Sequence, residues 1–228
     1  MTGTSVLAAN DVHLSYGDTV ALRGASLELT SGERVALMGP SGSGKSSLLH
    51  CLAGIIRPDS GEVTLEGTRV DTLSERVRSR LRLERMGVVF QFGDLVPELT
   101  LVENVMLPLQ LLGRKKREAR ATAMHLLAAL DIDGVADRRT GAVSGGQAQR
   151  AAVARALVHR PPIVLADEPT GSLDTVTAEV VLEAMVSLST QIGAALLVVT
   201  HDNLVAAHLD RHVEMRDGTV TRAAEVLG

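Results

Sequence analysis

The feature that most constrains this chain is a glycine-rich segment of eight residues, Gly39-Pro40-Ser41-Gly42-Ser43-Gly44-Lys45-Ser46. It follows the strand pattern Arg34–Met38 and precedes a helical pattern over Ser46–Ala53, the context that the spacing G-x-x-x-x-G-K-[ST] requires. Glycines let the backbone wrap closely around a phosphate, and successive N–H groups at a helix N-terminus bind anions. The segment therefore predicts a nucleotide-binding loop, in which Lys45 reaches the β- and γ-phosphates and the Ser46 hydroxyl binds Mg²⁺.

Two adjacent carboxylates follow a second apolar strand pattern. Ile163–Ala166 leads directly into Asp167 and Glu168, and open α/β sheets bind their ligands at the carboxyl ends of such strands. Behind a phosphate-binding loop, Asp167 is predicted to belong to the Mg²⁺ shell. Glu168 is predicted to orient and deprotonate the attacking water, a role worth about 10²–10⁴-fold in rate.

A third segment, Ser144-Gly145-Gly146-Gln147, opens a helical pattern that continues to His159. A serine hydroxyl, exposed N–H groups and a helix N-terminus together make a second anion site. Two phosphate sites in one chain leave two alternatives open. The chain binds two ligands, or each site contributes half of a shared one.

The strand and helix patterns alternate, which predicts a parallel sheet with helices on its faces. Helical spacing dominates the middle of the chain and predicts an inserted helical subdomain over residues 93–159. We expect one domain over residues 1–228, with residues 1–92 and 160–228 as the nucleotide-binding core. The predicted strands cover Val6–Ala9, Ser26–Leu29, Arg34–Met38, Glu62–Leu65, Gly87–Phe90, Ile163–Ala166, Ala195–Thr200 and Val213–Met215.

Composition excludes several classes of function. Twenty-seven acidic residues against 23 basic ones give a net charge of −4, which argues against nucleic acid as a partner. The one cysteine, Cys51, excludes a disulfide framework and a cysteine-built zinc site. No stretch of eighteen apolar residues and no standard secretion signal occur, so we expect neither a membrane span nor export.

These segments resemble the motifs of the nucleotide-binding subunit of ATP-binding cassette (ABC) transporters, over nearly all of the chain. Gly39–Ser46 resembles Walker A, Ile163–Glu168 Walker B and Ser144–Gln147 the signature sequence. The smaller motifs are the Q-loop glutamine Gln91, the D-loop Ser172–Asp174, the switch histidine His201 and the adenine-stacking aromatic Tyr16.

The resemblance implies a fold, ligands and roles for residues. The fold is α/β: a P-loop NTPase (RecA-like) core, an N-terminal antiparallel β part and an inserted α-helical subdomain. The ligands are ATP and Mg²⁺. Glu168, His201 and Gln91 are the implied catalytic residues, and Ser46, Gln91 and Asp167 the implied metal ligands. Implied nucleotide contacts are Tyr16, Gly39–Gly44, Lys45, Ser46, Ser47, Ser144–Gln147 and Asp174.

The resemblance also implies partners. Two copies pair head to tail, with ATP between one copy's Walker A loop and the other's signature, so each site is half of a shared one. A separate transmembrane permease completes the transporter and holds this subunit at the cytoplasmic, inner face of the membrane. The expected coupling surface is Gln91–Thr100 together with the helical subdomain.

One branch of the family is favoured. Phe90–Thr100 and Leu165–Asp174 are similar to the lipoprotein-release and macrolide-export type. Three features depart from that branch: Val143 in place of leucine, Ser172 in place of asparagine, and a shorter segment between Gly17 and Leu22. The alternatives are an importer ATPase and a soluble ABC ATPase that acts on DNA or ribosomes. The substrate is not encoded here, because in this family the permease selects it.

Overall fold

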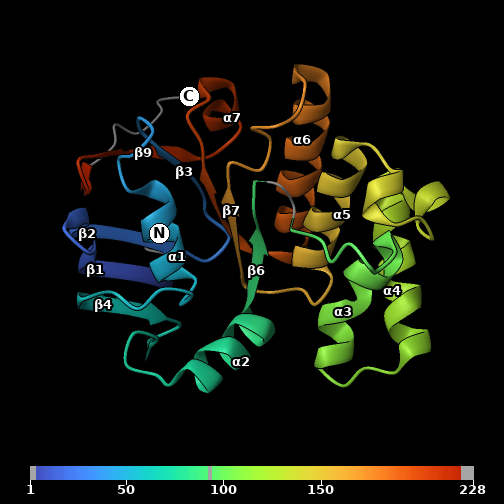
Figure 1. The fold of residues 1–228 in the computed structure, drawn as a ribbon, viewed down its shortest axis with the longest axis horizontal. Coiled ribbons are helices and arrows are strands. Elements are labelled where there is room, and N and C mark those ends of the chain that lie inside the picture. The colour runs from blue at the N-terminus through green and yellow to red at the C-terminus, as the bar shows by residue number, and fades with distance from the viewer. Residues whose placement is uncertain (1–3, 92–93, 222–228) are drawn as a thin grey trace.

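A computed structural model describes residues 4–91 and 94–221 (Figure 1), and its centre is a six-stranded sheet in the order β10-β9-β3-β8-β7-β6. β3, β8, β7, β6 and β9 are parallel, as the alternating pattern predicts, and β10 pairs antiparallel with β9 at one edge. The strands are β3 (Arg34–Met38), β6 (Met86–Val89), β7 (Ile163–Asp167), β8 (Ala195–Val199), β9 (Arg211–Arg216) and β10 (Thr219–Thr221).

The central strands are apolar along their whole length because the sheet is covered on both faces. All five residues of β7 and of β8 are buried, and the two strands pair in register from Ile163↔Ala195 to Asp167↔Val199. Parallel pairing puts the carboxyl ends of β3, β7 and β8 at one edge of the sheet. The glycine-rich loop, the carboxylate pair and His201 follow these three ends, so the sheet brings them together.

The N-terminal part forms a separate antiparallel sheet in the order β2-β1-β4-β5. Its strands are β1 (Ser5–Tyr16), β2 (Thr19–Thr30), β4 (Ser60–Leu65) and β5 (Thr68–Arg69). Helix α1 (Lys45–Leu52) shares one apolar cluster with this sheet and with one face of the parallel sheet. β1 and β2 are each much longer than the predicted segments, because register shifts such as that between Ala9 and Val12 interrupt the alternation of apolar and polar residues.

Three helices lie on the other side of β6 and β7 from α1: α3 (Leu101–Leu111), α4 (Lys116–Ala129) and α5 (Gly145–Leu157) (Figure 1). They pack around a cluster that includes Met106, Leu127 and Ile132. α5 has one face in this cluster, through Ala154, and another in the cluster under β7 and β8, through Val153. α5 therefore belongs as much to the sheet as to the helical part.

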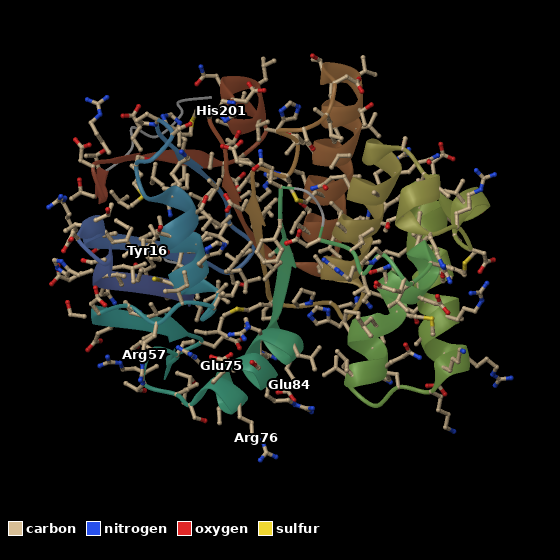
Figure 2. All side chains as sticks on the ribbon, in the orientation of Figure 1. Tyr16, Arg57, Glu75, Arg76, Glu84 and His201 are labelled. Carbon is tan, nitrogen blue, oxygen red and sulfur yellow. The ribbon has the colours of Figure 1, made fainter. Side chains whose placement is uncertain are left out.

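The remaining helices are α2 (Glu75–Arg85), α6 (Thr175–Ile192) and α7 (Asn203–Ala207), with 3₁₀ turns over Asp133–Val135 and Thr140–Ala142. α2 is charged, and Figure 2 shows Arg76 projecting from it away from the rest of the chain. Across residues 4–91 and 94–221, every helix is too short or too polar to cross a lipid bilayer.

Candidate active site

The glycine-rich loop depends on glycine at two close backbone contacts. A Cβ on Gly39 would lie 2.1 Å from the carbonyl oxygen of Met215, and one on Gly44 would lie 2.5 Å from that of Ala21. Both residues also have positive φ angles, 146° and 103°, which L side chains rarely adopt. The Gly218 N–H donates to the Ser43 carbonyl at 3.0 Å, so the β9–β10 hairpin supports the loop from behind. The sequence analysis did not foresee that support.

The loop has the donors and the open space that a phosphate needs. Pro40, Ser41 and Gly42 form its exposed turn, and a Cβ on Gly42 would meet nothing within 4 Å. Lys45 is buried and its Nζ donates to the carbonyls of Gly39 and Pro40, at 2.8 and 3.0 Å.

Ser43 gives a second indication that this loop fits an anion. Its side chain is 4% exposed, and its hydroxyl has no hydrogen-bond partner among the residues that the structure describes. Buried hydroxyls are normally hydrogen-bonded, so this donor fits a ligand oxygen in the loop.

The predicted metal ligands Ser46 and Asp167 lie side by side. The Ser46 hydroxyl donates to Asp167 Oδ1 at 3.1 Å, although 121 residues separate them. Burial raises the pKa of Asp167, and the hydrogen bond from Ser46 only partly opposes that shift. A buried carboxylate beside a hydroxyl offers the hard oxygen ligands that Mg²⁺ prefers, and the cation would offset the cost of the buried charge.

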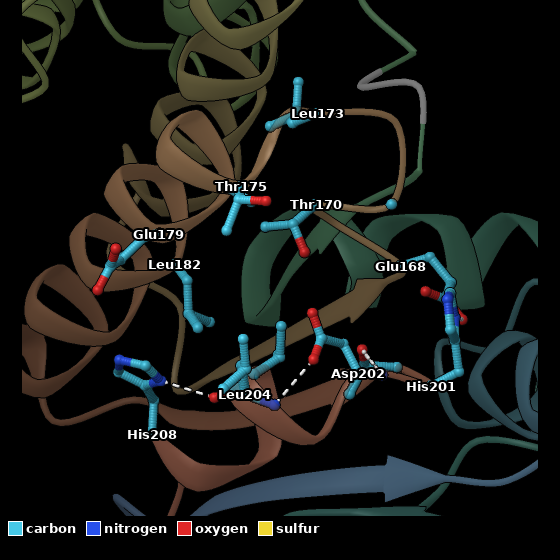
Figure 3. Close-up of a pocket in the computed structure, with 14 residues that line it drawn as sticks. Glu168, Thr170, Leu173, Thr175, Glu179, Leu182, His201, Asp202, Leu204 and His208 are labelled. Carbon is cyan, nitrogen blue, oxygen red and sulfur yellow. Dashed lines mark hydrogen bonds and ion pairs between the residues drawn. The ribbon is translucent and has the colours of Figure 1, made fainter.

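Glu168 and His201 meet above the edge of the sheet (Figure 3). His201 Nδ1 donates to Glu168 Oε1 at 2.9 Å. Glu168 has a φ of +46°, and its N–H donates to the carbonyl of Val199 at 3.0 Å. Both side chains line a cavity of about 330 Å³ together with Thr170, Gly171, Thr200 and Asp202. A carboxylate held by an imidazole at the rim of such a cavity can accept a proton from water.

Gln91 lies beside the turn that follows β7, and Asp174 lies where the chain continues from that turn into α6. The Cβ position of Gly171 lies 3.2 Å from Gln91 Nε2 and 3.6 Å from the Glu168 Cβ, so the Gln91 amide lies beside the Glu168 turn. Asp174 caps α6: its carboxylate accepts the Thr177 N–H at 3.1 Å and the Thr177 hydroxyl at 2.7 Å. These hydrogen bonds lower the pKa of Asp174.

Tyr16 lies at the end of β1, close to the first turn of α1. Its ring is half exposed, and its hydroxyl is 3.5 Å from the Ser47 hydroxyl. An exposed ring beside a phosphate-binding loop is available to stack on a nucleotide base.

The structure does not bring Ser144–Gln147 to the glycine-rich loop of the same chain. α5 and α1 lie on opposite sides of β6 and β7 (Figure 1). Ser144 and Gly145 are exposed at the start of α5, where Ser144 and Gln147 form a reciprocal capping box. Gly146 is buried, and a Cβ there would lie 2.3 Å from Thr177 Cγ2. The exposed N-terminus of α5 therefore lies apart from the glycine-rich loop of its own chain.

Two polar residues of α5 that sequence analysis did not single out bind backbone carbonyls before and after Gln91. Gln149 Nε2 donates to the carbonyl of Phe90 at 3.2 Å, and Arg155 Nη1 donates to that of Asp94 at 2.8 Å. Phe92 and Gly93, part of the predicted coupling segment, lie outside the described residues. In the sequence, the signal that could have revealed Gln149 was an amide side chain within an alanine-rich helical segment.

Comparison with known proteins shows the family to which the chain belongs. A family model described as ABC transporter matches residues 22–171. A lipoprotein-releasing system ATP-binding protein, LolD 2 of Caulobacter vibrioides, is 46% identical over 202 residues, 89% of each chain. LolD of Legionella pneumophila (strain Lens) is 41% identical over 219 residues, which cover 94% of this chain and 96% of that protein. The expected resemblance to the lipoprotein-release branch is confirmed, despite the short segment between Gly17 and Leu22.

Solved structures agree with the fold. The ATP-binding cassette MJ0796, in a dimeric post-hydrolysis state bound to ADP and Pi, superposes with a TM-score of 0.90 at 36% identity, covering 97% of this chain and 99% of that one. CbiO1 of Clostridium perfringens, part of the transporter complex cbiONQ, superposes with a TM-score of 0.86 at 27% identity, covering 97% and 89%. The expected fold, an α/β core with an antiparallel β part and an inserted helical part, is therefore confirmed. The chain belongs to the ABC transporter family, as one of its ATP-binding and ATP-hydrolysing cassettes.

Proposed function

We propose that this chain pairs head to tail with a second copy and powers export or extraction of a substrate through a separate membrane permease. The observation that carries the proposal is the 46% identity, over 89% of both chains, to a lipoprotein-releasing system ATP-binding protein. The subunit then works at the cytoplasmic face of the inner membrane, bound to its permease.

ATP binding in this proposal uses the loop and its neighbours. Gly39–Ser47 surrounds the phosphates, the Ser43 hydroxyl gains the partner that it lacks, and Tyr16 stacks on the base. Lys45 leaves the two carbonyls that hold it and moves its charge to the β- and γ-phosphates. Ser46, Asp167 and Gln91 would hold Mg²⁺, which when bound would neutralise charge on the phosphate oxygens.

Hydrolysis in this proposal uses the Glu168–His201 pair. Glu168 accepts a proton from the attacking water, and His201 orients the carboxylate through Nδ1. Gln91 lies close enough to this turn to place the water or the metal.

The second copy contributes the other half of each site. Ser144 and Gly145 are exposed at a helix N-terminus, on the other side of β6 and β7 from their own loop, as a site that completes the partner subunit's nucleotide would be. MJ0796 is a dimer in its structure with ADP and Pi, which supports the pairing of two copies. Loss of the γ-phosphate removes the bridge between the copies and releases the dimer.

The permease docks where the two parts of the chain meet. We propose residues 1–92 and 160–228 as the nucleotide-binding core and residues 93–159 as the helical subdomain. Between them lies a cavity of about 260 Å³, mostly apolar, lined by Ile55, Leu83, Phe90, Pro108, Arg155 and His159 among others. Phe90 precedes Gln91 directly, so a permease segment in this cavity would touch the backbone that carries Gln91.

The test is co-expression with the permease encoded beside this chain, followed by purification of the complex and ATPase assays in lipid. We expect a stable complex whose ATPase rate exceeds that of the free subunit, with Leu83→Asp weakening association and the exposed-surface variant Arg76→Asp as a control. Association with a permease that works with a substrate-binding protein would instead indicate that the chain is an importer ATPase. Absence of any permease complex, with activity stimulated by DNA or ribosomes, would overturn the proposal.

A further inference from the structure

α5 and the two residues after it run along β6 in the opposite direction and contact this segment at three levels. At one end His159 Nε2 hydrogen-bonds the carbonyl of Met86 at 3.1 Å. Next, the backbones approach so closely that a Cβ on Gly87 would lie 2.3 Å from the carbonyl oxygen of Ala156. At the other end, Gln149 donates to the carbonyl of Phe90 at 3.2 Å. α5, which Ser144 caps, is therefore bound to β6, the strand that ends just before Gln91.

Gln149 is an unusual residue for this position on the helix. Its side chain is 3% exposed, and the neighbouring positions Ala151, Ala152 and Val153 are completely buried. A primary amide in such surroundings is costly unless it is hydrogen-bonded, and an apolar side chain of the same size would avoid that cost. The hydrogen bond to the Phe90 carbonyl therefore explains the amide at this position better than side-chain packing does.

The Phe90 carbonyl controls the residue that follows it. The Phe90 C=O and the Gln91 N–H belong to one planar peptide unit, so fixing the oxygen fixes the plane from which Gln91 begins. The Gln91 amide in turn lies 3.2 Å from the Cβ position of Gly171, beside Glu168. A rotation of this peptide would move the Gln91 side chain away from the Glu168 turn.

We propose that Gln149 is the positioning residue for Gln91, and that α5 thereby links the signature end of the helix directly to the catalytic edge of the same chain. The proposal rests on the role given to Gln91 in the proposed function. In the free subunit Gln149 keeps the Gln91 amide beside Glu168. Displacement of α5, by the second copy at Ser144 or by the permease near Arg155 and His159, is transmitted to Gln91 through this one hydrogen bond.

The decisive variant is Gln149→Met, which keeps an unbranched side chain of similar volume and removes the donor. We expect kcat for ATP hydrolysis to fall about 10- to 100-fold, as misplacement of a catalytic group does. KM for ATP should stay within about twofold of the parent value, because the phosphate-binding loop is untouched. Val153→Ala is the matched control: it weakens packing on the same helix without removing a donor, so it should lower Tm and leave kcat near the parent value.

A double-mutant cycle separates positioning from mere structure. If Gln149 acts through Gln91, Gln149→Met in a Gln91→Ala background should cause no further loss of kcat, although each single variant is impaired. Independent, multiplicative losses would overturn the proposal, as would a kcat for Gln149→Met equal to that of the parent or of Val153→Ala. The cycle uses basal ATPase activity of the free subunit. A failure to find any permease complex would therefore count against the proposed function without affecting this result.

Discussion

His201 Nδ1 and Glu168 Oε1 lie 2.9 Å apart, although 33 residues separate the two side chains along the chain. The two residues follow β8 and β7, which pair as parallel neighbours, so their carboxyl ends lie next to each other. Glu168 is mostly buried with its side chain 18% exposed, whereas that of His201 is 67% exposed. His201 thus binds the Glu168 carboxylate from the solvent side, and a ligand in solvent can contact His201.

The first prediction follows from this pair. Glu168→Gln keeps the size of the side chain and its hydrogen bond to His201, but removes the proton acceptor. Hydrolysis should fall about 10²–10⁴-fold, measured as phosphate release. ATP binding should survive, since Lys45, Ser46 and Asp167 are unchanged. Sedimentation of the variant with MgATP should therefore show a persistent dimer, where the parent dimerises only transiently. Hydrolysis near the parent rate would remove Glu168 from the role of base.

The second prediction concerns Lys45. Its Nζ donates to two backbone carbonyls of the loop, at 2.8 and 3.0 Å, and can exchange these weak acceptors for phosphate oxygens. Lys45→Ala should weaken ATP binding at least about tenfold, because a charge-assisted contact to phosphate is worth about 1.5–3 kcal/mol. Calorimetry measures the effect, and Lys116→Ala on α4 is the control. Equal affinity of Lys45→Ala and parent would contradict the assignment.

The third prediction concerns Tyr16, half exposed at the rim of the same loop. Stacking on a base is worth about 1–3 kcal/mol, so Tyr16→Ala should raise the dissociation constant for ATP about 5- to 150-fold. Tyr16→Phe should bind like the parent, because the ring and not the hydroxyl makes the contact. An unchanged affinity of Tyr16→Ala for ATP would mean that Tyr16 contributes only to packing.

The fourth prediction tests whether two copies share each site. Lys45→Ala disables the loop, and Ser144→Arg blocks the exposed start of α5. Each variant alone should be inactive. A mixture should regain activity, because half of its dimers then contain one intact site, which gives up to about one quarter of the parent rate by random pairing. No recovery, with both variants folded by circular dichroism, would count against a site shared between copies.

The fifth prediction is a pH dependence of stability. Burial lowers the pKa of His159 below its usual value of 6.5, and the hydrogen bond to the Met86 carbonyl only partly opposes this. In the unfolded chain the imidazole therefore takes up a proton at a higher pH than in the folded one. The free energy of unfolding should accordingly fall as pH drops below 6.5, by at most about 1.4 kcal/mol per pH unit from this group.

Denaturant titrations between pH 5 and 7.5 check this. His159→Gln should flatten the dependence in that range, and His125→Gln, exposed on α4, should leave the parent slope unchanged. A slope equally steep in His159→Gln would mean that another group carries the acid sensitivity.

Local patterns were sufficient where one short run of residues carries the whole signal. The loop from Gly39 to Ser46 makes its turn and starts α1 with its own glycines. β7 and β8 are predicted correctly because a strand buried on both faces must be apolar throughout. By contrast, β5, β10 and α7 were not predicted, since short elements leave little periodic signal.

The sequence alone predicts the chemistry: a glycine-rich loop suited to phosphate, two carboxylates after an apolar strand, a serine-glycine segment that opens a helix, and a histidine after the next strand. How these parts constrain one another depends on the tertiary structure. Met215 forces glycine at position 39, Ser46 meets Asp167, and Gln149 holds the peptide before Gln91. Each of these contacts joins residues at least 59 positions apart. Such contacts arise from the order of the strands and the packing of α5, which no local pattern of side chains encodes.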